Sequence, residues 1–168
     1  RLEDSFGHQI RRETEPGRYL TAEAGILVTE VRAVKRQGSK KYLLVDAGFH
    51  TLARPVLYGS YHPMSLCPTS TTPPHELEAV AIGGPLCESG DIFTQEEGGF
   101  VSTRDLPPAR VGDLLVIEVA GAYGFVMASN YNSKPFPAEV LIDGGTSRLV
   151  RARQTAEELF SGESLPQE

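Results

Sequence analysis

The chain has 168 residues, which is enough for one domain with a sizeable core and too few for two. Hydrophobic residues make up 40% and charged residues 23%, as in ordinary globular proteins, and the net charge of −6 argues against nucleic-acid binding. Cys67 and Cys87 form no CxxC motif and have no zinc-like spacing to the histidines, and no apolar run approaches membrane-spanning length. We therefore expect a cytoplasmic protein that binds small polar metabolites and holds no metal.

The first half of the chain is rich in predicted strands and turns. Residues 1–14 are polar and typical of a connector, and a short helical segment follows between Gly17 and Gly25. Two β-rich runs flank "RQGSKK", which predicts a hairpin over residues 26–49 with a glycine in its turn. Residues 55–64 are predicted to be extended, and residues 67–74 form a predicted loop.

The second half continues this pattern. Residues 75–82 and 113–121 are predicted strands, and residues 135–153 form a second predicted hairpin with an Asp-Gly-Gly tip. Only residues 154–162, "QTAEELFSG", are typical of a helix. Together the segments predict a mainly-β fold, an antiparallel barrel or sandwich with small helices.

Two segments contain residues suited to binding anions. In "EPGR", Glu15 to Arg18, a glycine amide beside an arginine can hold a phosphate or carboxylate, although the four residues alone fit an ordinary turn better. Arg54 and Tyr58 lie four residues apart, and a guanidinium beside a phenol suits the same ligands. An exposed arginine packed on a tyrosine ring explains that spacing equally well.

Two further segments follow predicted strands. "GPLCESGD" places Cys87 and Glu88 in a turn, where side chains reach a cleft and a thiol can transfer a proton. A buried structural cysteine is the more common case. Tyr123 lies in "GAYG", where small neighbours let the backbone approach a flat ligand, and it fits a core aromatic residue as well.

Four segments, in their order along the chain, resemble the C-terminal half of diaminopimelate decarboxylases, pyridoxal-phosphate enzymes of the alanine-racemase fold type. They are "EPGRYLTAEAG", "DAGFHTLARPVLYGSYHPM", "GPLCESGD" and "GAYGFVMASNYNSKPFPAEVLI", and they extend from residue 15 to residue 142. The resemblance implies an antiparallel Greek-key β-barrel or sandwich that follows an N-terminal (β/α)8 barrel. Residues 1–24 would then be a connector and the end of that barrel, and residues 25–168 the β-domain.

The resemblance also implies roles for matching residues. Cys87 resembles the catalytic proton donor and Glu88 the ligand of the substrate's distal amino group, both acting across a dimer interface. Arg54 and Tyr58 resemble substrate ligands, with the arginine pairing with the distal carboxylate. The residues that resemble ligands of pyridoxal 5′-phosphate are Glu15, Gly17, Arg18 and Tyr123, and Arg18 and Tyr123 also resemble substrate ligands.

The implied reaction is the conversion of meso-diaminopimelate to L-lysine and carbon dioxide in lysine biosynthesis, by a homodimer. The lysines of this chain, Lys35, Lys40, Lys41 and Lys134, match no segment that carries the family's Schiff-base lysine. We therefore expect this chain to be inactive without the N-terminal barrel that supplies it.

Two alternatives remain open at this point. Relatives that decarboxylate D-ornithine, D-lysine or ornithine-like amino acids can share the same motifs. A non-catalytic β-domain that only binds a barrel is a second alternative, against which the intact set of matching residues argues.

Overall fold

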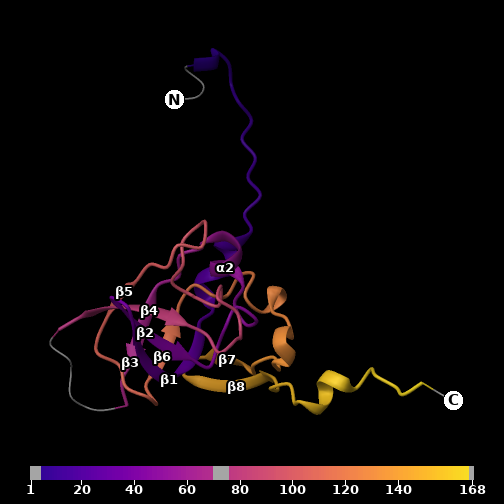
Figure 1. Ribbon diagram of the computed structural model, residues 1–168. Helices are drawn as coiled ribbons and strands as arrows, with labels where there is room; N and C mark the ends of the chain where they lie inside the picture. Colours follow the sequence, from indigo (N-terminus) through magenta and orange to yellow (C-terminus); the bar gives the residue numbers. More distant parts are fainter. Residues whose placement is uncertain (1–4, 70–75, 167–168) are drawn as a thin grey trace.

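The computed structural model describes residues 5–69 and 76–166, and its body is a six-stranded sheet (Figure 1). The strands are β1 (Leu27–Gln37), β2 (Lys40–Val45), β3 (Met64–Cys67), β4 (Glu78–Gly83), β5 (Arg104–Leu106) and β6 (Leu114–Ile117). Their order in the sheet is β3-β6-β1-β2-β4-β5. The two edge strands, β3 and β5, contact each other, so the sheet nearly closes into a barrel. The predicted mainly-β, barrel-like fold is thus confirmed.

The barrel encloses an aliphatic core with one large aromatic side chain, Phe93. In β6, Leu115 and Ile117 are fully buried while Leu114 is exposed, which is the two-residue alternation of a strand with one face in the core. Burying each such side chain contributes about 1.5–3 kcal/mol. The fully buried aliphatic residues of this core are Val31, Leu43, Val45, Leu52, Val80, Ile82, Leu115 and Ile117.

β1 is long enough to pair with two different neighbours. Residues 27–30 pair with β6, and the rest of the strand pairs with β2. The register shifts between Val31 and Ala33, where a bulge lets one strand turn from one partner to the other. The predicted first hairpin is confirmed, with Gly38 in its turn at φ 60.

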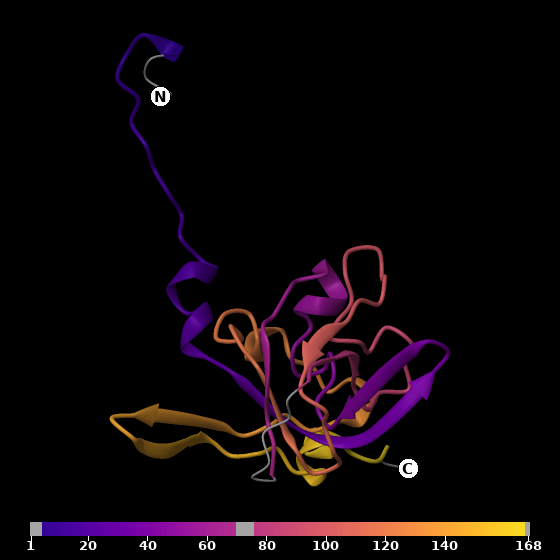
Figure 2. The same cartoon turned by 90° about the vertical axis from the view of Figure 1, so that its left-hand side faces the viewer.

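One strand pair departs from the predicted antiparallel pattern. β2 and β4 are parallel, whereas the other pairs in the sheet are antiparallel. A parallel pair cannot be joined by a hairpin and requires a crossover connection. Here that connection, residues 46–77, carries the helix α2 (Arg54–Tyr58) and β3. α2 lies at the end of the barrel from which the N-terminal segment leaves (Figures 1 and 2).

The prediction that residues 55–64 are extended is wrong over its first part. Pro55 stands in the first turn of α2, where its missing N–H costs nothing, and Gly59 ends the helix in a left-handed conformation. The predicted loop over residues 67–74 and the start of the predicted strand over residues 75–82 lie largely outside the described residues. The rest of that strand is β4.

Apart from residues 5 and 6, which are also helical, short 3-10 turns account for the remaining helical structure of the described residues. The helix predicted over residues 154–162 is a single such turn, and the strand predicted over residues 113–121 ends at Ile117. Among the described residues, no helix has the length and apolar character needed to cross a membrane. The turns are Arg18–Leu20, Ala22–Ala24, Phe125–Met127, Tyr131–Ser133 and Glu157–Phe160.

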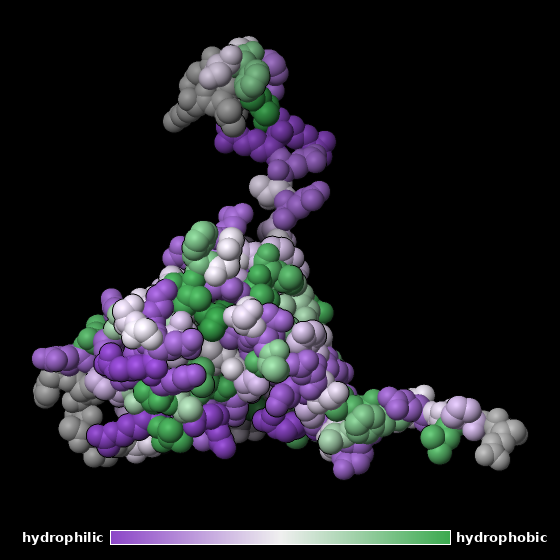
Figure 3. Space-filling view, in the orientation of Figure 1, coloured by the Kyte–Doolittle hydropathy of each residue, from purple (hydrophilic) through white to green (hydrophobic). Residues whose placement is uncertain are grey.

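A hairpin and the N-terminal segment project from the barrel. The second predicted hairpin is confirmed as β7 (Glu139–Asp143) and β8 (Thr146–Arg151), which form a separate two-stranded sheet (Figure 2). Its exposed apolar side chains are Val140, Leu141, Ile142, Leu149 and Val150. The N-terminal segment leaves the body as an extended, largely hydrophilic stretch (Figure 3), of which residues 1–4 lie outside the described residues.

Candidate active site

α2 carries two of the predicted site residues, Arg54 and Tyr58, and a third, Tyr123, lies beside Arg54. Arg54 and Tyr58 lie four residues apart and therefore share one face of the helix. The guanidinium carbon of Arg54 lies 5.5 Å from the ring centroid of Tyr58 and 5.7 Å from that of Tyr123. Its Nη2 also donates a hydrogen bond to Ser60 Oγ at 3.3 Å. Two aromatic rings thus orient one arginine fork.

Gly17 lies against the phenol of Tyr123. A Cβ atom at Gly17 would lie 2.8 Å from the Tyr123 hydroxyl oxygen, so this close approach requires glycine. Tyr123 itself has a φ of 57, an uncommon conformation for a residue with a side chain, and it belongs to the tight "GAYG" turn after β6. The N-terminal "EPGR" segment therefore meets the same site as α2.

His62 lies near three arginines of this region. It is fully buried, and Nδ1 lies 2.9 Å from the carbonyl oxygen of Glu118. A carbonyl can only accept, so Nδ1 carries the proton and Nε2 is an acceptor, which has no partner among the described residues.

Burial and three nearby positive charges lower the pKa of His62 below its ordinary value. Burial is the largest cause, the hydrogen bond to Glu118 opposes it, and the charges of Arg18, Arg54 and Arg104 lower the pKa further. The ring is therefore neutral near pH 7. Three arginines thus surround one buried imidazole, which places Arg18 in the same region as Arg54.

The three arginines carry unused hydrogen-bond donors. The Nε atoms of Arg18, Arg54 and Arg104 are all buried and have no acceptor within residues 5–69 and 76–166. A buried cationic donor without an acceptor is costly, because it has lost its water without a replacement. Arg104 is held in place by the ring of Tyr61, 4.3 Å away. This arrangement favours an anionic ligand.

The Cys87–Glu88 loop lies beside α2. Both residues are exposed, and Cys87 is a free thiol. Glu88 Oε1 accepts hydrogen bonds from Gly90 N at 3.1 Å and Ser89 Oγ at 3.2 Å. A Cβ atom built at Gly90 would lie 3.5 Å from Val56 Cγ2, so the loop packs against the helix.

Asp91 joins this loop to the segment that leads into α2. Its buried carboxylate accepts hydrogen bonds from Phe49 N at 2.8 Å and Leu86 N at 2.9 Å. Burial raises the pKa of Asp91, the two hydrogen bonds oppose that rise, and the charge of Glu88 adds to it. Gly48 and Gly84 leave room for the carboxylate, since a Cβ at either position would lie 2.7 or 2.2 Å from Oδ2.

The structure does not bring all the predicted residues together. Gly17, Arg54, Tyr58 and Tyr123 form one cluster, and Arg18 approaches it at His62. Among the described residues, no hydrogen bond, ion pair or ring contact links Cys87 or Glu88 to this cluster. Glu15 is exposed and forms no ion pair or hydrogen bond with the described part of the chain.

Sequence reasoning missed three residues of this region, His62, Arg104 and Asp91. His62 lies four residues after Tyr58, and Asp91 closes the "CESGD" stretch, so both stood next to recognised motifs. Nothing near Arg104 in the sequence distinguishes it. In the described part of the chain, no group of three or more His, Cys, Asp or Glu side chains could hold a metal ion.

Known proteins resemble this chain in both sequence and structure. The model of the pyridoxal-dependent decarboxylase C-terminal sheet domain matches residues 18–121. The diaminopimelate decarboxylase of Escherichia coli (strain K12) is 52% identical over 162 residues, which cover 95% of this chain and 39% of that protein. The Streptomyces coelicolor diaminopimelate decarboxylase is 49% identical over 166 residues, 98% of this chain and 38% of that protein.

A solved structure gives the same result. A crystal structure of a diaminopimelate decarboxylase superposes with a TM-score of 0.84 and 51% identity, over 95% of this chain and 38% of that chain. The chain therefore spans about two fifths of the length of the curated relatives that it matches.

Proposed function

Since this chain belongs to the pyridoxal-dependent decarboxylases, as a C-terminal sheet domain, we propose that it is the C-terminal part of a diaminopimelate decarboxylase. The full protein would convert meso-diaminopimelate to L-lysine and carbon dioxide in lysine biosynthesis. The observation that carries this proposal is the set of buried Nε donors on Arg18, Arg54 and Arg104 that have no acceptor among the described residues. Both carboxylates of the substrate and a cofactor phosphate are acceptors that such donors require.

The residues of this region fit pyridoxal 5′-phosphate. Gly17 offers a bare backbone next to the hydroxyl of Tyr123, and Arg18 has a buried donor without an acceptor within the described residues. We propose that these three residues, together with Glu15, hold the cofactor. When bound, it supplies an electron sink for the bond to the departing carboxylate. The lysine that anchors it is expected in an N-terminal barrel outside this chain.

Arg54, Tyr58 and Glu88 would recognise the far end of the substrate. That end carries a carboxylate and an ammonium group. The Arg54 fork, oriented by the rings of Tyr58 and Tyr123, can bind the carboxylate through paired hydrogen bonds, and the Glu88 carboxylate can bind the ammonium group. An amino acid that lacks the distal carboxylate would leave Arg54 unpaired, and this penalty gives selectivity.

Cys87 would supply the proton that completes the reaction. Loss of carbon dioxide leaves the substrate Cα in need of a proton on one face, and an exposed free thiol can donate it. The Asp91 carboxylate accepts hydrogen bonds from Phe49 N and Leu86 N, which fixes the backbone of the loop that carries the thiol.

We propose that Cys87 and Glu88 complete the site of a second subunit in a homodimer. Their exposure supports this, as does the lack of any contact with the Arg54 cluster among the described residues. The exposed apolar side chains of the β7–β8 hairpin support a further interface with the N-terminal barrel.

The test is carbon dioxide release by the full-length protein with pyridoxal phosphate and meso-diaminopimelate. D-lysine, D-ornithine and L-ornithine are assayed in parallel. We expect turnover selective for meso-diaminopimelate, and a Cys87→Ala variant with kcat lower by about 100-fold or more, the usual contribution of a general acid. Cys67 is also exposed and free, so Cys67→Ala is the matched control and should keep its rate.

Each result that differs from this has a defined meaning. Turnover of another amino acid in preference would contradict the proposed substrate. Equal rates for the two cysteine variants would contradict the role of Cys87. A folded, cofactor-loaded protein that turns over none of the four substrates would contradict the enzyme assignment itself.

A further inference from the structure

A cavity with several polar side chains in its lining lies apart from the residues of the proposed active site. It has a volume of about 270 Å³ and is bounded by the start of β1, the segment that leads into α2, and the two segments that flank the β7–β8 hairpin. Its polar lining residues are Asp46, His50, Thr51, Lys134 and Arg153. None of the residues proposed above to bind cofactor or substrate lines it.

His50 is the buried polar side chain of this cavity. It is only 3% exposed, and its Nδ1 is buried without a hydrogen-bond partner among the described residues. Burial, and after it the charge of Lys134, lowers the pKa of His50, so the ring is neutral near pH 7. A neutral imidazole carries one N–H donor, and leaving polar ring atoms unpaired in the interior is costly.

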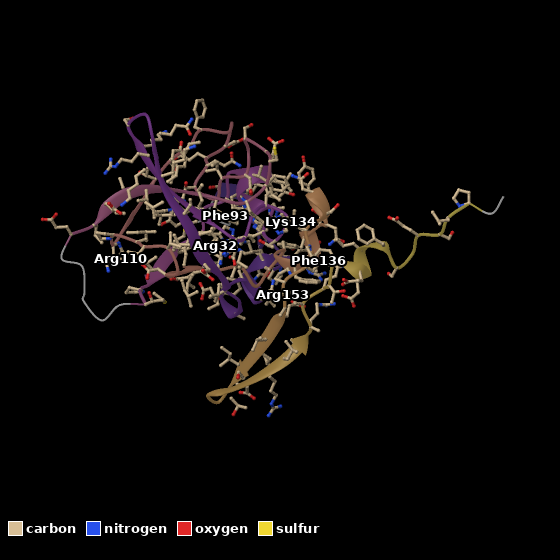
Figure 4. All side chains as sticks on the ribbon, turned by 60° about the horizontal axis from the view of Figure 1, so that its bottom comes forward. Arg32, Phe93, Arg110, Lys134, Phe136 and Arg153 are labelled. Atoms are coloured by element: carbon tan, nitrogen blue, oxygen red, sulfur yellow. The ribbon has the colours of Figure 1, made fainter. Side chains whose placement is uncertain are left out.

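Two cations lie at the same cavity without partners. Lys134 is half-buried and Arg153 is exposed, and neither forms an ion pair or a side-chain hydrogen bond within residues 5–69 and 76–166. Figure 4 shows them near one another where the hairpin joins the body. Asp46 also lines the cavity, but its Oδ1 already accepts hydrogen bonds from the Thr29 hydroxyl and Glu30 N.

Hydrogen bonds between neighbouring segments hold these groups in place. Gln154 Oε1 accepts hydrogen bonds from Asn130 Nδ2 at 2.7 Å and Phe136 N at 3.0 Å, which fixes the Arg153 segment against the Lys134 segment. Ser129 N donates to the carbonyl of His50 at 2.9 Å. These hydrogen bonds fix the segments that line the cavity relative to one another.

We infer that this cavity binds an oxyanion, a phosphate or carboxylate group, between Lys134, Arg153 and His50. Two cations and an imidazole donor supply the charge-assisted hydrogen bonds that such a group accepts. The group is either a free anion or a carboxylate from a part of the full-length protein outside this chain. The two sources present the same chemistry to the three residues.

Inorganic phosphate titrated into the chain at constant ionic strength tests the inference. The ring C–H signals of the histidines are followed by NMR, and the His50 signal is assigned by its loss in His50→Gln. We expect the His50 signal to shift saturably with one phosphate bound, while the exposed His8 signal does not. Lys134→Gln and Arg153→Gln should each weaken binding by about tenfold or more. Arg148→Gln, which removes an exposed arginine from β8, is the matched control and should leave binding unchanged.

The same titration of the full-length protein separates the two sources. Phosphate binding that persists there identifies a free anion. A His50 signal that already has its bound-state position without phosphate, and does not respond to it, identifies an internal carboxylate. A His50 signal that responds to neither phosphate nor acetate in the chain would overturn the inference. Binding equally strong in Lys134→Gln, Arg153→Gln and Arg148→Gln would overturn it as well.

Discussion

Asp91 fixes two loops that the proposed chemistry needs at once. One of its oxygens accepts from Phe49 N, five residues before Arg54, and the other accepts from Leu86 N, next to Cys87. Both N–H groups would be unpaired without it. A single carboxylate therefore sets the distance between the arginine site and the thiol loop.

We predict that Asp91→Asn lowers the free energy of unfolding by about 2–3 kcal/mol, because the amide offers one acceptor where two are needed and turns an NH2 group toward the second buried donor. Urea unfolding measures this loss. Asp105→Asn in β5, where the carboxylate is exposed, is the control and should change the value by less than about 0.5 kcal/mol. Equal effects at the two positions would show that the Asp91 contacts are not stabilising.

At the scale of single residues, the sequence predicted the residues with distinctive chemistry and missed the residues that support them. Arg54, Tyr58 and Tyr123 stood in recognisable segments, and the structure places the guanidinium of Arg54 near both rings. His62 and Arg104 matter because the fold places them near Arg18, which comes from a distant part of the chain. Such non-local proximity has no signature in a single sequence.

Among the elements, α2 needs a glycine, Gly59, at its C-terminal end. Gly59 ends the helix at φ 59, and a Cβ there would lie 2.1 Å from the backbone nitrogen of Glu97. Gly38, in the β1–β2 turn, has nearly the same φ of 60 but nothing within 4 Å of its Cβ position. Replacement by alanine therefore carries the same conformational cost at both glycines, and only at Gly59 does the new Cβ atom also clash with the backbone.

We predict that Gly38→Ala costs about 1–2 kcal/mol of stability, the usual penalty for a left-handed residue with a side chain. Gly59→Ala should cost at least about 1–3 kcal/mol more, because the clash adds to that penalty. Urea unfolding of both variants gives the difference between their free energies of unfolding. If Gly59→Ala is no worse than Gly38→Ala, the Glu96–Glu97 loop can move aside and does not fix α2.

The prediction of elements succeeded where local signals are strong. Both hairpins carry glycine turns between apolar runs, and both are present. α2 was missed because five residues give no helical period to detect. The parallel pairing of β2 with β4 was missed because strand neighbours follow from tertiary packing, which the alternation of side chains does not encode.

At the scale of the whole molecule, two buried histidines make the fold sensitive to acid. The pKa values of His50 and His62 are both lowered from 6.5, in each case chiefly by burial. Below about pH 6.5 the unfolded chain binds protons that the folded chain rejects, so stability falls as the pH falls.

We predict that the free energy of unfolding decreases from pH 7 to pH 5, by at most about 1.4 kcal/mol per pH unit for each histidine. Urea unfolding at several pH values gives this slope. His50→Gln and His62→Gln should each reduce the slope of the unfolding free energy against pH, whatever the absolute stability of the variant. His8→Gln, at an exposed site, should leave this slope unchanged. A slope that is unchanged in both buried-site variants would assign the acid sensitivity to other groups.

The domain boundary predicted at residues 24 and 25 stays a prediction, and β1 begins at Leu27. The arrangement of the barrel required the structure, because most of its strand pairs join distant segments. Among the described strands, β1–β2, β4–β5 and β7–β8 pair neighbours in the chain, whereas β1–β6, β3–β6 and β2–β4 pair strands that are not consecutive.

The strand order has a consequence for synthesis on the ribosome. β6, late in the chain, lies between β1 and β3 and pairs with both. Until residue 118 has left the exit tunnel, these two early strands lack their common neighbour, and His62 lacks the Glu118 carbonyl that orients its ring. Until then the nascent chain carries an open sheet edge and an unassembled arginine cluster, and an open edge is a place where chains pair wrongly and aggregate.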